Sequence, residues 1–279
     1  MFIDGCCGRL HVECKGEGRA ILLWHSLLCD GNMWEYQIGP LSQRYFVVNI
    51  DAPGHGRSDP MVKPYSMDDC VEALFEVMDA LSINEAAMVG LSWGGMVGMR
   101  AAIARPDRIK ALAVLDSNAD AESWDRLPKY RLMGWIADIF GPIPPLLDRL
   151  EPIFFSDLTR KQRPDLIRKL REGIIKMDRA SIRHAVHCVE FDRKDIRSQL
   201  CRIVCPTLVM CGTEDRATPI ERSKDIACRI PGAELALIPG AGHLSAWECP
   251  ELVNPILLSW LERVWGGEAP GQEENREGA

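Results

Sequence analysis

The first part of the chain alternates between two hydrophobic patterns. Short apolar runs are separated by stretches in which apolar residues recur every three or four positions. This alternation is typical of βαβ units and predicts an α/β fold with a mostly parallel sheet. The clearest helix is expected to begin after Ser66, because Asp69 three positions later completes a capping box. Strands are expected at residues 10–14, 20–24, 45–50, 86–91 and 109–115.

The pattern changes after Asp116. Residues 118–195 lack the alternation and are expected to form several helices, interrupted by GPIPP at residues 141–145 and by Pro164. The strand and helix patterns then return. Further strands are expected at 206–211 and 234–238, and further helices from Pro219 and from 250 to about 264.

These patterns predict a core interrupted by one insertion. Residues 1–117 and 196–265 form the α/β core, and residues 118–195 form a helical insertion in its parallel sheet. Residues 266–279 are rich in Gly and Glu and are expected to form a disordered tail.

Composition narrows the class of protein. The 279 residues include 33 Lys and Arg against 40 Asp and Glu, a formal charge of −7, and 47% are apolar. Such usage is globular, and the acidic balance argues against a nucleic-acid partner. No apolar run approaches the roughly 18 residues of a membrane helix, and the N-terminal residues do not resemble a signal peptide. We expect a soluble, cytoplasmic protein without a membrane partner.

The eleven cysteines do not indicate a disulfide framework. Their number is odd, and most lie among apolar residues, where a free thiol behaves as a small hydrophobic side chain. A metal site is the alternative, but the spacings of the His and Cys residues match no common zinc framework. We therefore expect reduced cysteines and no metal. The residues of that alternative site are His184, His187, Cys188, Cys201 and Cys205.

The segment GLSWGG at residues 90–95 is the first candidate for chemistry. It follows a predicted buried strand and opens a predicted helix, which is the context of a G-x-S-x-G nucleophile elbow. In such a turn flanking glycines allow a tight bend that exposes the serine hydroxyl. Ser92 is therefore a candidate nucleophile.

A serine nucleophile needs a base and an acid that orients the base. Asp215 follows the predicted strand 206–211, and His243 follows the strand 234–238. Both lie at the carboxyl edge of the sheet, where open α/β sheets place their sites. The order Ser92, Asp215, His243 along the chain predicts a catalytic triad. Asp116, at the end of its own strand, is the alternative acid.

The chain resembles the α/β-hydrolase superfamily over about residues 9–264. The elbow, the Asp215 and His243 positions, LLWHSL at 22–27 and DAPGHGRSD at 51–59 carry the resemblance. It implies an oxyanion hole formed by the backbone N–H groups of Leu27 and Trp93. The family usually has His-Gly where this chain has His25-Ser26, and His-Ser-Leu is similar to 3-oxoadipate enol-lactonase-like esterases. The Ser26 hydroxyl either adds a donor near the oxyanion or caps the loop.

The expected activity is hydrolysis of a carboxylic ester or lactone through an acyl-enzyme, without a cofactor. Haloalkane dehalogenases and epoxide hydrolases of this fold need a carboxylate where this chain has Ser92. C–C bond hydrolysis or a lyase reaction on the same triad remains an alternative. A ligand receptor built on a hydrolase scaffold is a second one, and the oligomeric state is open.

Residues 118–195 are expected to act as a lid over Ser92. The segment is rich in aromatic and aliphatic residues, and Trp135 and Phe140 are expected to line an apolar substrate pocket. The alternative is that these residues form only the lid's own core. Between Arg126 and Arg183 there are 13 Lys and Arg against 7 Asp and Glu. A carboxylated enol-lactone and a neutral macrolactone, such as a macrolide ring, both remain open as substrates.

Overall fold

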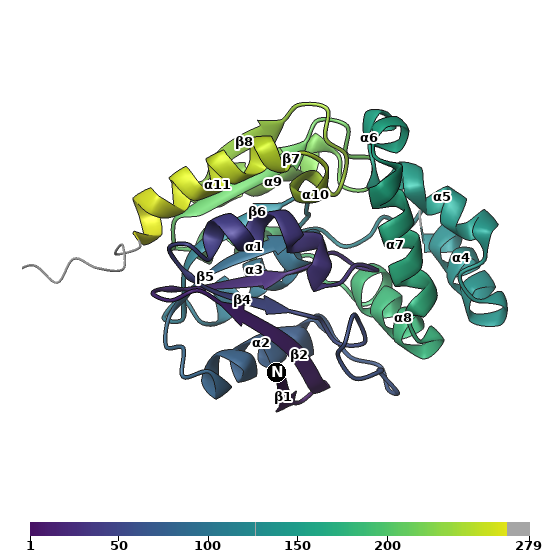
Figure 1. The fold of residues 1–279 in the computed structure, drawn as a ribbon, viewed down its shortest axis with the longest axis horizontal. Helices are drawn as coiled ribbons and strands as arrows, with labels where there is room; N and C mark the ends of the chain where they lie inside the picture. Colours follow the sequence, from purple (N-terminus) through teal and green to yellow (C-terminus); the bar gives the residue numbers. More distant parts are fainter. Residues whose placement is uncertain (126, 267–279) are drawn as a thin grey trace, which may run out of the picture.

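The computed structural model describes residues 1–125 and 127–266, and its centre is an eight-stranded sheet (Figure 1). The strand order is β1-β2-β4-β3-β5-β6-β7-β8. β2 is antiparallel to both β1 and β4, and the other neighbouring strands are parallel. The strands are β1 Phe2–Gly5, β2 Gly8–Lys15, β3 Ala20–Trp24, β4 Phe46–Ile50, β5 Ala86–Leu91, β6 Ile109–Leu115, β7 Thr207–Gly212 and β8 Glu234–Ile238.

The strands agree closely with the sequence prediction. β3, β5, β6 and β8 have the predicted bounds, and β4 and β7 begin one residue later than predicted. β3, β5 and β7 are buried at every position, as expected for parallel strands covered on both faces. β1 was not predicted, because Ile3 is its single buried residue and so short a strand has no readable alternation.

Helices flank the sheet in two groups. α1 packs against α11, whereas α2 packs against α3. The predicted capping box of α2 is confirmed, since the Ser66 hydroxyl accepts from Asp69 N–H and the Asp69 carboxylate accepts from Ser66 N–H. The core helices are α1 Glu35–Leu41, α2 Met67–Ala80, α3 Trp93–Ala104, α9 Ile220–Arg229, α10 Ser245–Glu248 and α11 Pro250–Trp265.

A second set of helices connects β6 to β7. Figure 1 shows α4 to α8 gathered at one end of the sheet, on the right of the view. A π-helical turn, His187–Phe191, follows α8 directly. This is the helical segment expected from the loss of alternation after Asp116. Its helices are α4 Leu127–Phe140, α5 Pro144–Phe154, α6 Asp157–Gln162, α7 Pro164–Lys176 and α8 Arg179–Val186.

Most of the predicted C-terminal tail, residues 267–279, lies outside the described residues. Within the described ranges, no helix combines the length and the apolar character that a membrane span requires.

Candidate active site

Ser92 lies in a strained turn between β5 and α3. Its backbone has φ 55° and ψ −110°, an unfavourable region for a residue with a Cβ, which costs about 1–3 kcal/mol. The flanking glycines are sterically required. A Cβ on Gly94 would lie 2.0 Å from the carbonyl oxygen of Trp24, and one on Gly90 would lie 2.2 Å from the Gly94 backbone. The elbow therefore explains the G-x-S-x-G spacing.

The structure brings the three predicted triad residues together. His243 Nε2 lies 2.8 Å from Ser92 Oγ, and His243 Nδ1 lies 2.9 Å from Asp215 Oδ2. All three side chains are buried. With Nδ1–H donating to Asp215, Nε2 is free to accept the serine proton, which is the tautomer that a general base requires.

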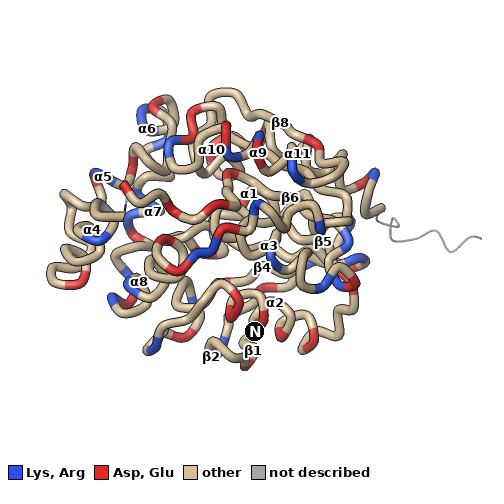
Figure 2. Tube along the Cα trace, turned by 180° about the vertical axis from the view of Figure 1, so that it is seen from behind, with Lys and Arg blue, Asp and Glu red and all other residues tan. Residues whose placement is uncertain are grey.

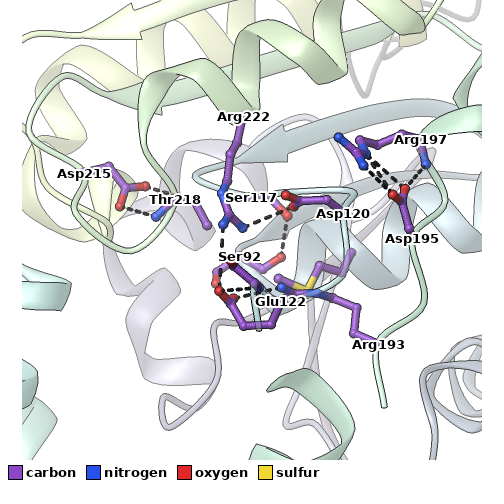
Figure 3. Close-up of polar contacts among 12 residues, drawn as sticks. Ser92, Ser117, Asp120, Glu122, Arg193, Asp195, Arg197, Asp215, Thr218 and Arg222 are labelled. Atoms are coloured by element: carbon purple, nitrogen blue, oxygen red, sulfur yellow. Dashed lines mark hydrogen bonds and ion pairs between the residues drawn. The ribbon is translucent and has the colours of Figure 1, made fainter. Parts of the chain in front are cut away.

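The loop after Asp215 holds its carboxylate in place. Oδ1 accepts hydrogen bonds from the backbone N–H groups of Ala217 and Thr218, and Oδ2 accepts from the Thr218 hydroxyl at 2.6 Å. Figure 3 shows Thr218 directed toward Asp215. These donors fix the orientation of the carboxyl group that faces the imidazole.

The surroundings of His243 raise its pKa above the ordinary value of 6.5. Burial alone would lower that pKa, because it disfavours the imidazolium. The charge and hydrogen bond of Asp215 outweigh burial, and the charges of Asp116 and Glu248 add to the effect. An imidazolium that forms during a reaction is therefore stabilised.

Asp116, the alternative acid, is directed elsewhere. One carboxyl oxygen accepts from Gly212 N–H at 2.8 Å, and the other accepts from the N–H and hydroxyl of Ser245. Among the described residues, no hydrogen bond joins Asp116 to His243. Burial and then the charge of Asp215 raise the pKa of Asp116 well above its ordinary value. The geometry thus favours Asp215 as the residue that orients the imidazole.

Two backbone N–H groups near Ser92 have no acceptor within the described residues. They belong to Leu27, in the loop after β3, and to Trp93, the first residue of α3. The Ser26 hydroxyl is also buried without a partner there, and Ser26 and Leu27 line the same cavity as Ser92. The Trp93 side chain is not among the residues that line this cavity. It is fully buried and packs edge-on against Trp24.

Two neutral histidines brace the loop that carries Leu27. His25 Nε2 accepts from Ala52 N–H at 2.9 Å, and His55 Nε2 accepts from Leu28 N–H at 3.3 Å. Burial lowers the pKa of both, that of His55 to about 3, so both are neutral and able to accept. His55 thus supports the loop rather than acting on a substrate. Leu28, at φ 63°, needs such support.

A mainly apolar cavity of about 130 Å³ opens beside Ser92 and His243. Much of its wall comes from the helices between β6 and β7, as expected. Apolar lining residues include Met133, Ala137, Leu146, Leu147, Leu150, Ile153, Phe154, Ile174, Ile182, Val186 and Val189.

The expectation that Trp135 and Phe140 line this cavity is wrong. Their side chains are 58% and 57% exposed, and neither is among the lining residues. Both are on α4, and the opposite face of that helix contributes Tyr130, Met133 and Ala137 to the wall.

Sequence reasoning missed a polar part of the cavity wall. Asn118, Glu122, Glu190 and Arg193 also line it. Asn118 lies two positions after Asp116 at the carboxyl edge of the sheet, a position that marks candidate site residues. Glu190 and Arg193 lie near the end of the inserted segment, where no local pattern distinguishes them.

One group of side chains has the residue types of a metal site. Ligand atoms of Asp116, Cys211 and Asp215 lie within 4.8 Å of one another. Both carboxylates already accept hydrogen bonds from protein donors, and burial raises the pKa of the Cys211 thiol, which disfavours the thiolate that binds metals. The two carboxyl groups therefore act as acceptors for protein N–H groups, and the three residues fit that role better than a metal site.

The fold and the site together define a class of protein. A family model described as alpha/beta hydrolase fold matches residues 19–250. The chain therefore belongs to the α/β-hydrolase fold family, as the resemblance predicted, and it is a hydrolase.

Individual relatives are similar over nearly their whole length. The chain is 27% identical to 3-oxoadipate enol-lactonase 2 of Acinetobacter baylyi over 248 residues, which cover 88% of this chain and 89% of the relative. A malate-bound thermophilic esterase from Thermogutta terrifontis superposes with a TM-score of 0.88 and 28% identity, covering 95% and 98% of the two chains. An enol-lactonase from Burkholderia xenovorans superposes with a TM-score of 0.86 and 27% identity, covering 94% of this chain and 99% of the enol-lactonase.

Proposed function

We propose that the protein hydrolyses a small carboxylic ester or lactone through an acyl-enzyme. The observation that carries the proposal is the hydrogen-bonded series Ser92–His243–Asp215, which ends at an apolar cavity. The relatives named as enol-lactonases and an esterase support the same bond class.

The reaction follows from the positions of the groups. Ser92 Oγ attacks the acyl carbon while His243 Nε2 takes its proton, and the tetrahedral oxyanion accepts from the N–H groups of Leu27 and Trp93. His243 then gives the proton to the leaving alkoxide as the C–O bond breaks. A water molecule, deprotonated by His243, attacks the acyl-enzyme, and the proton returns to Ser92 when the acid product leaves. Asp215 keeps the imidazole oriented throughout.

The cavity favours a small and largely apolar substrate. Its volume of about 130 Å³ is close to the roughly 150 Å³ of an engineered protein cavity that binds benzene. A short acyl chain or a small lactone ring matches that size. A macrolide ring is much larger, and its entry requires displacement of α4 or α5. We therefore favour the small lactone over the macrolactone.

We also propose that residues 118–195 act as the lid that determines substrate choice. α5 contributes Leu147 and Phe154 to the cavity wall, and the Phe154 carbonyl accepts from the backbone N–H of His243 at 3.0 Å. The helices between β6 and β7 thus touch both the cavity and the catalytic loop. A change of packing in these helices alters the shape of the cavity beside Ser92.

A hydrolysis panel tests the proposed bond class. We expect measurable turnover of short-chain aryl esters and small lactones, weaker turnover of macrolactones, and none of C–C substrates such as vinylogous diketones. Rates should be unchanged after exhaustive treatment with EDTA, since the triad needs no Lewis acid. Turnover confined to the C–C substrates, or tight ligand binding without turnover, would favour one of the alternatives instead.

The raised pKa of His243 predicts the acid limb of the pH profile. His243 acts as a base only when neutral, so kcat/KM should fall as the pH drops through the His243 pKa, with a midpoint above 6.5. The rate is measured from pH 5 to 9. In Asp215→Asn the residual activity should show a lower midpoint, because the main charge that raises this pKa is gone. A wild-type midpoint well below 6.5 would contradict the assignment.

A further inference from the structure

The cavity beside Ser92 has a polar corner that the proposed reaction does not use. Asn118, Glu122, Glu190 and Arg193 line this corner, and they come from both ends of the segment between β6 and β7. The rest of the wall, apart from the catalytic groups, is mostly aliphatic. Four such groups in an apolar cavity indicate recognition of a polar part of the ligand.

Two polar atoms of this corner are buried without a partner among the described residues. They are Asn118 Oδ1 and Arg193 Nε, on side chains of residues that are only 2% and 4% exposed. Buried donors and acceptors are nearly always hydrogen-bonded in folded proteins. One atom is an acceptor and the other a donor, so a ligand group that enters the corner can satisfy both kinds of site.

The charge of Arg193 is already matched by protein carboxyl groups. Its Nη2 donates to Glu122 Oε2 at 3.0 Å, and Figure 3 shows Arg193 and Arg222 approaching Glu122 from two sides. Arg222 is shared, since it lies 3.8 Å from Glu122 and donates to Asp120 at 3.1 Å.

Glu190 adds a further carboxyl group to the corner. It is hydrogen-bonded to Glu122, and burial, together with the charge of Glu122, raises the pKa of Glu190 to about 7 despite the opposing charge of Arg193. Two carboxyl groups in contact share a proton more readily than they accept another anion. A ligand carboxylate would therefore meet Glu122 and Glu190 as well as Arg193.

The basic excess of the inserted helices does not change this balance. Arg160, Arg163, Arg171 and Arg183 form ion pairs with acidic residues. In Figure 2, basic and acidic residues are interspersed along these helices rather than gathered. Among the described residues, Arg193 is the one Lys or Arg that lines the cavity. The cavity thus lacks the uncompensated cation that a carboxylated substrate would need.

We propose that Asn118, Glu122, Glu190 and Arg193 form a specificity subsite that binds an uncharged hydrogen-bonding group of the substrate and selects against a carboxylate. A hydroxyl or amide group distant from the scissile bond fits both unpartnered atoms, because it can accept from Arg193 Nε and donate to Asn118 Oδ1. This inference rests on the proposed function, and it separates this chain from enzymes that act on carboxylated lactones.

The test compares 4-nitrophenyl and alkyl esters that differ only in one terminal group: methyl, hydroxyl or carboxylate. The group is placed on the acyl chain in one series and on the alcohol in a second. In at least one series we expect kcat/KM for the carboxylate ester to be about tenfold or more below that of the methyl ester, and the hydroxyl ester to have the highest kcat/KM. Binding of the same esters to the Ser92→Ala protein should follow the same order.

Variants assign the effect to the corner. Glu122→Gln removes the carboxylate that pairs with Arg193. It should raise kcat/KM for the carboxylate ester to or above the value for the methyl ester. Glu190→Gln keeps the Arg193–Glu122 ion pair and should reduce the ratio of kcat/KM between the methyl and carboxylate esters severalfold. It replaces Glu122→Gln in the test if that variant does not fold. Asn118→Leu should abolish the preference for the hydroxyl ester over the methyl ester, because the acceptor Asn118 Oδ1 is removed. Glu172→Gln, an exposed change on α7 outside the cavity, should leave every ratio unchanged.

The outcomes distinguish this inference from the proposed function. A wild-type protein that accepts the carboxylate ester as readily as the methyl ester in both series overturns the subsite. A discrimination that persists unchanged in Glu122→Gln and Glu190→Gln also overturns it. If the wild type hydrolyses no ester but the binding order holds in both proteins, the subsite stands and the proposed reaction fails.

Discussion

Replacing Ser92 with alanine is expected to lower kcat by about 10⁴-fold or more, because the members of a triad act as a unit. His243 Nε2 lies 2.8 Å from Ser92 Oγ, and within residues 1–125 and 127–266 no other hydroxyl makes a hydrogen bond to Nε2. The fold should be unaffected, since alanine accepts the φ of 55° at a cost similar to that of serine. The comparison uses kcat for the best ester of the panel and the thermal midpoint of each protein.

Active-site labelling supplies an independent readout for Ser92. A fluorophosphonate should modify the wild type at Ser92 and should not modify Ser92→Ala. Ser26→Ala is the matched control, because Ser26 lines the same cavity and is also buried. That variant should still be labelled, and its activity should fall by no more than the 10²–10³-fold typical of one oxyanion donor. More than a tenth of the wild-type activity in Ser92→Ala would rule out the proposed nucleophile.

The sequence predicted the sheet well because burial leaves a strong local signal. Strands such as β3 and β5 are covered on both faces, so every residue in them is apolar or small. The positions of Ser92 and Asp215 follow from the same signal, since each lies just after a strand buried at every position, whereas His243 follows the edge strand β8, in which only Ile238 is fully buried. Because the carboxyl ends of parallel strands meet at one edge of the sheet, the topology brings these three residues into hydrogen-bonded contact.

The inward-facing side of the proposed lid was harder to predict because α4 is apolar on more than one face. α4 carries Met133 and Ala137 on the side that lines the cavity, and Trp135 and Phe140 on the exposed side. Helical periodicity identifies both sets but cannot decide which set packs inward, because that choice depends on the neighbouring helices.

The polar corner of the cavity could not be predicted from the sequence for a different reason. Asn118 and Arg193 are far apart in sequence, and both line the cavity because the inserted segment begins and ends side by side, where Ile196 N–H donates to the Ala119 carbonyl. A charged residue in a helical insertion usually faces solvent, and its burial becomes evident only from the packed structure. Side-chain pairing of this kind carries no local pattern.

Asp215→Asn should be far more damaging than Asp116→Asn, although both carboxyl groups are buried at the same edge of the sheet. Asp215 accepts from His243 Nδ1 at 2.9 Å, and an amide at this position favours the wrong imidazole tautomer, an effect worth about 10⁴-fold in kcat in a well-studied serine protease. Among the described residues Asp116 makes no hydrogen bond to His243, and burial raises the pKa of its carboxyl group, so an asparagine of similar shape removes no contact with the imidazole.

The two substitutions therefore form a matched pair. They separate the effect of orienting the His243 imidazole from the effect of altering a buried carboxyl group. Asp116→Asn retains an oxygen that can accept from Gly212 N–H, and the Ser245 hydroxyl can rotate to suit the amide. The Ser245 N–H loses its acceptor, which lowers the stability of the fold but removes no group from the reaction. We expect it to keep kcat within about tenfold of the wild type, since it loses no contact to His243. Single-turnover acylation of Ser92 measures the effect directly, and thermal midpoints show whether either variant is unfolded. If Asp116→Asn abolishes acylation while Asp215→Asn remains active and folded, the orienting acid is the residue at the end of β6 and not the one after β7.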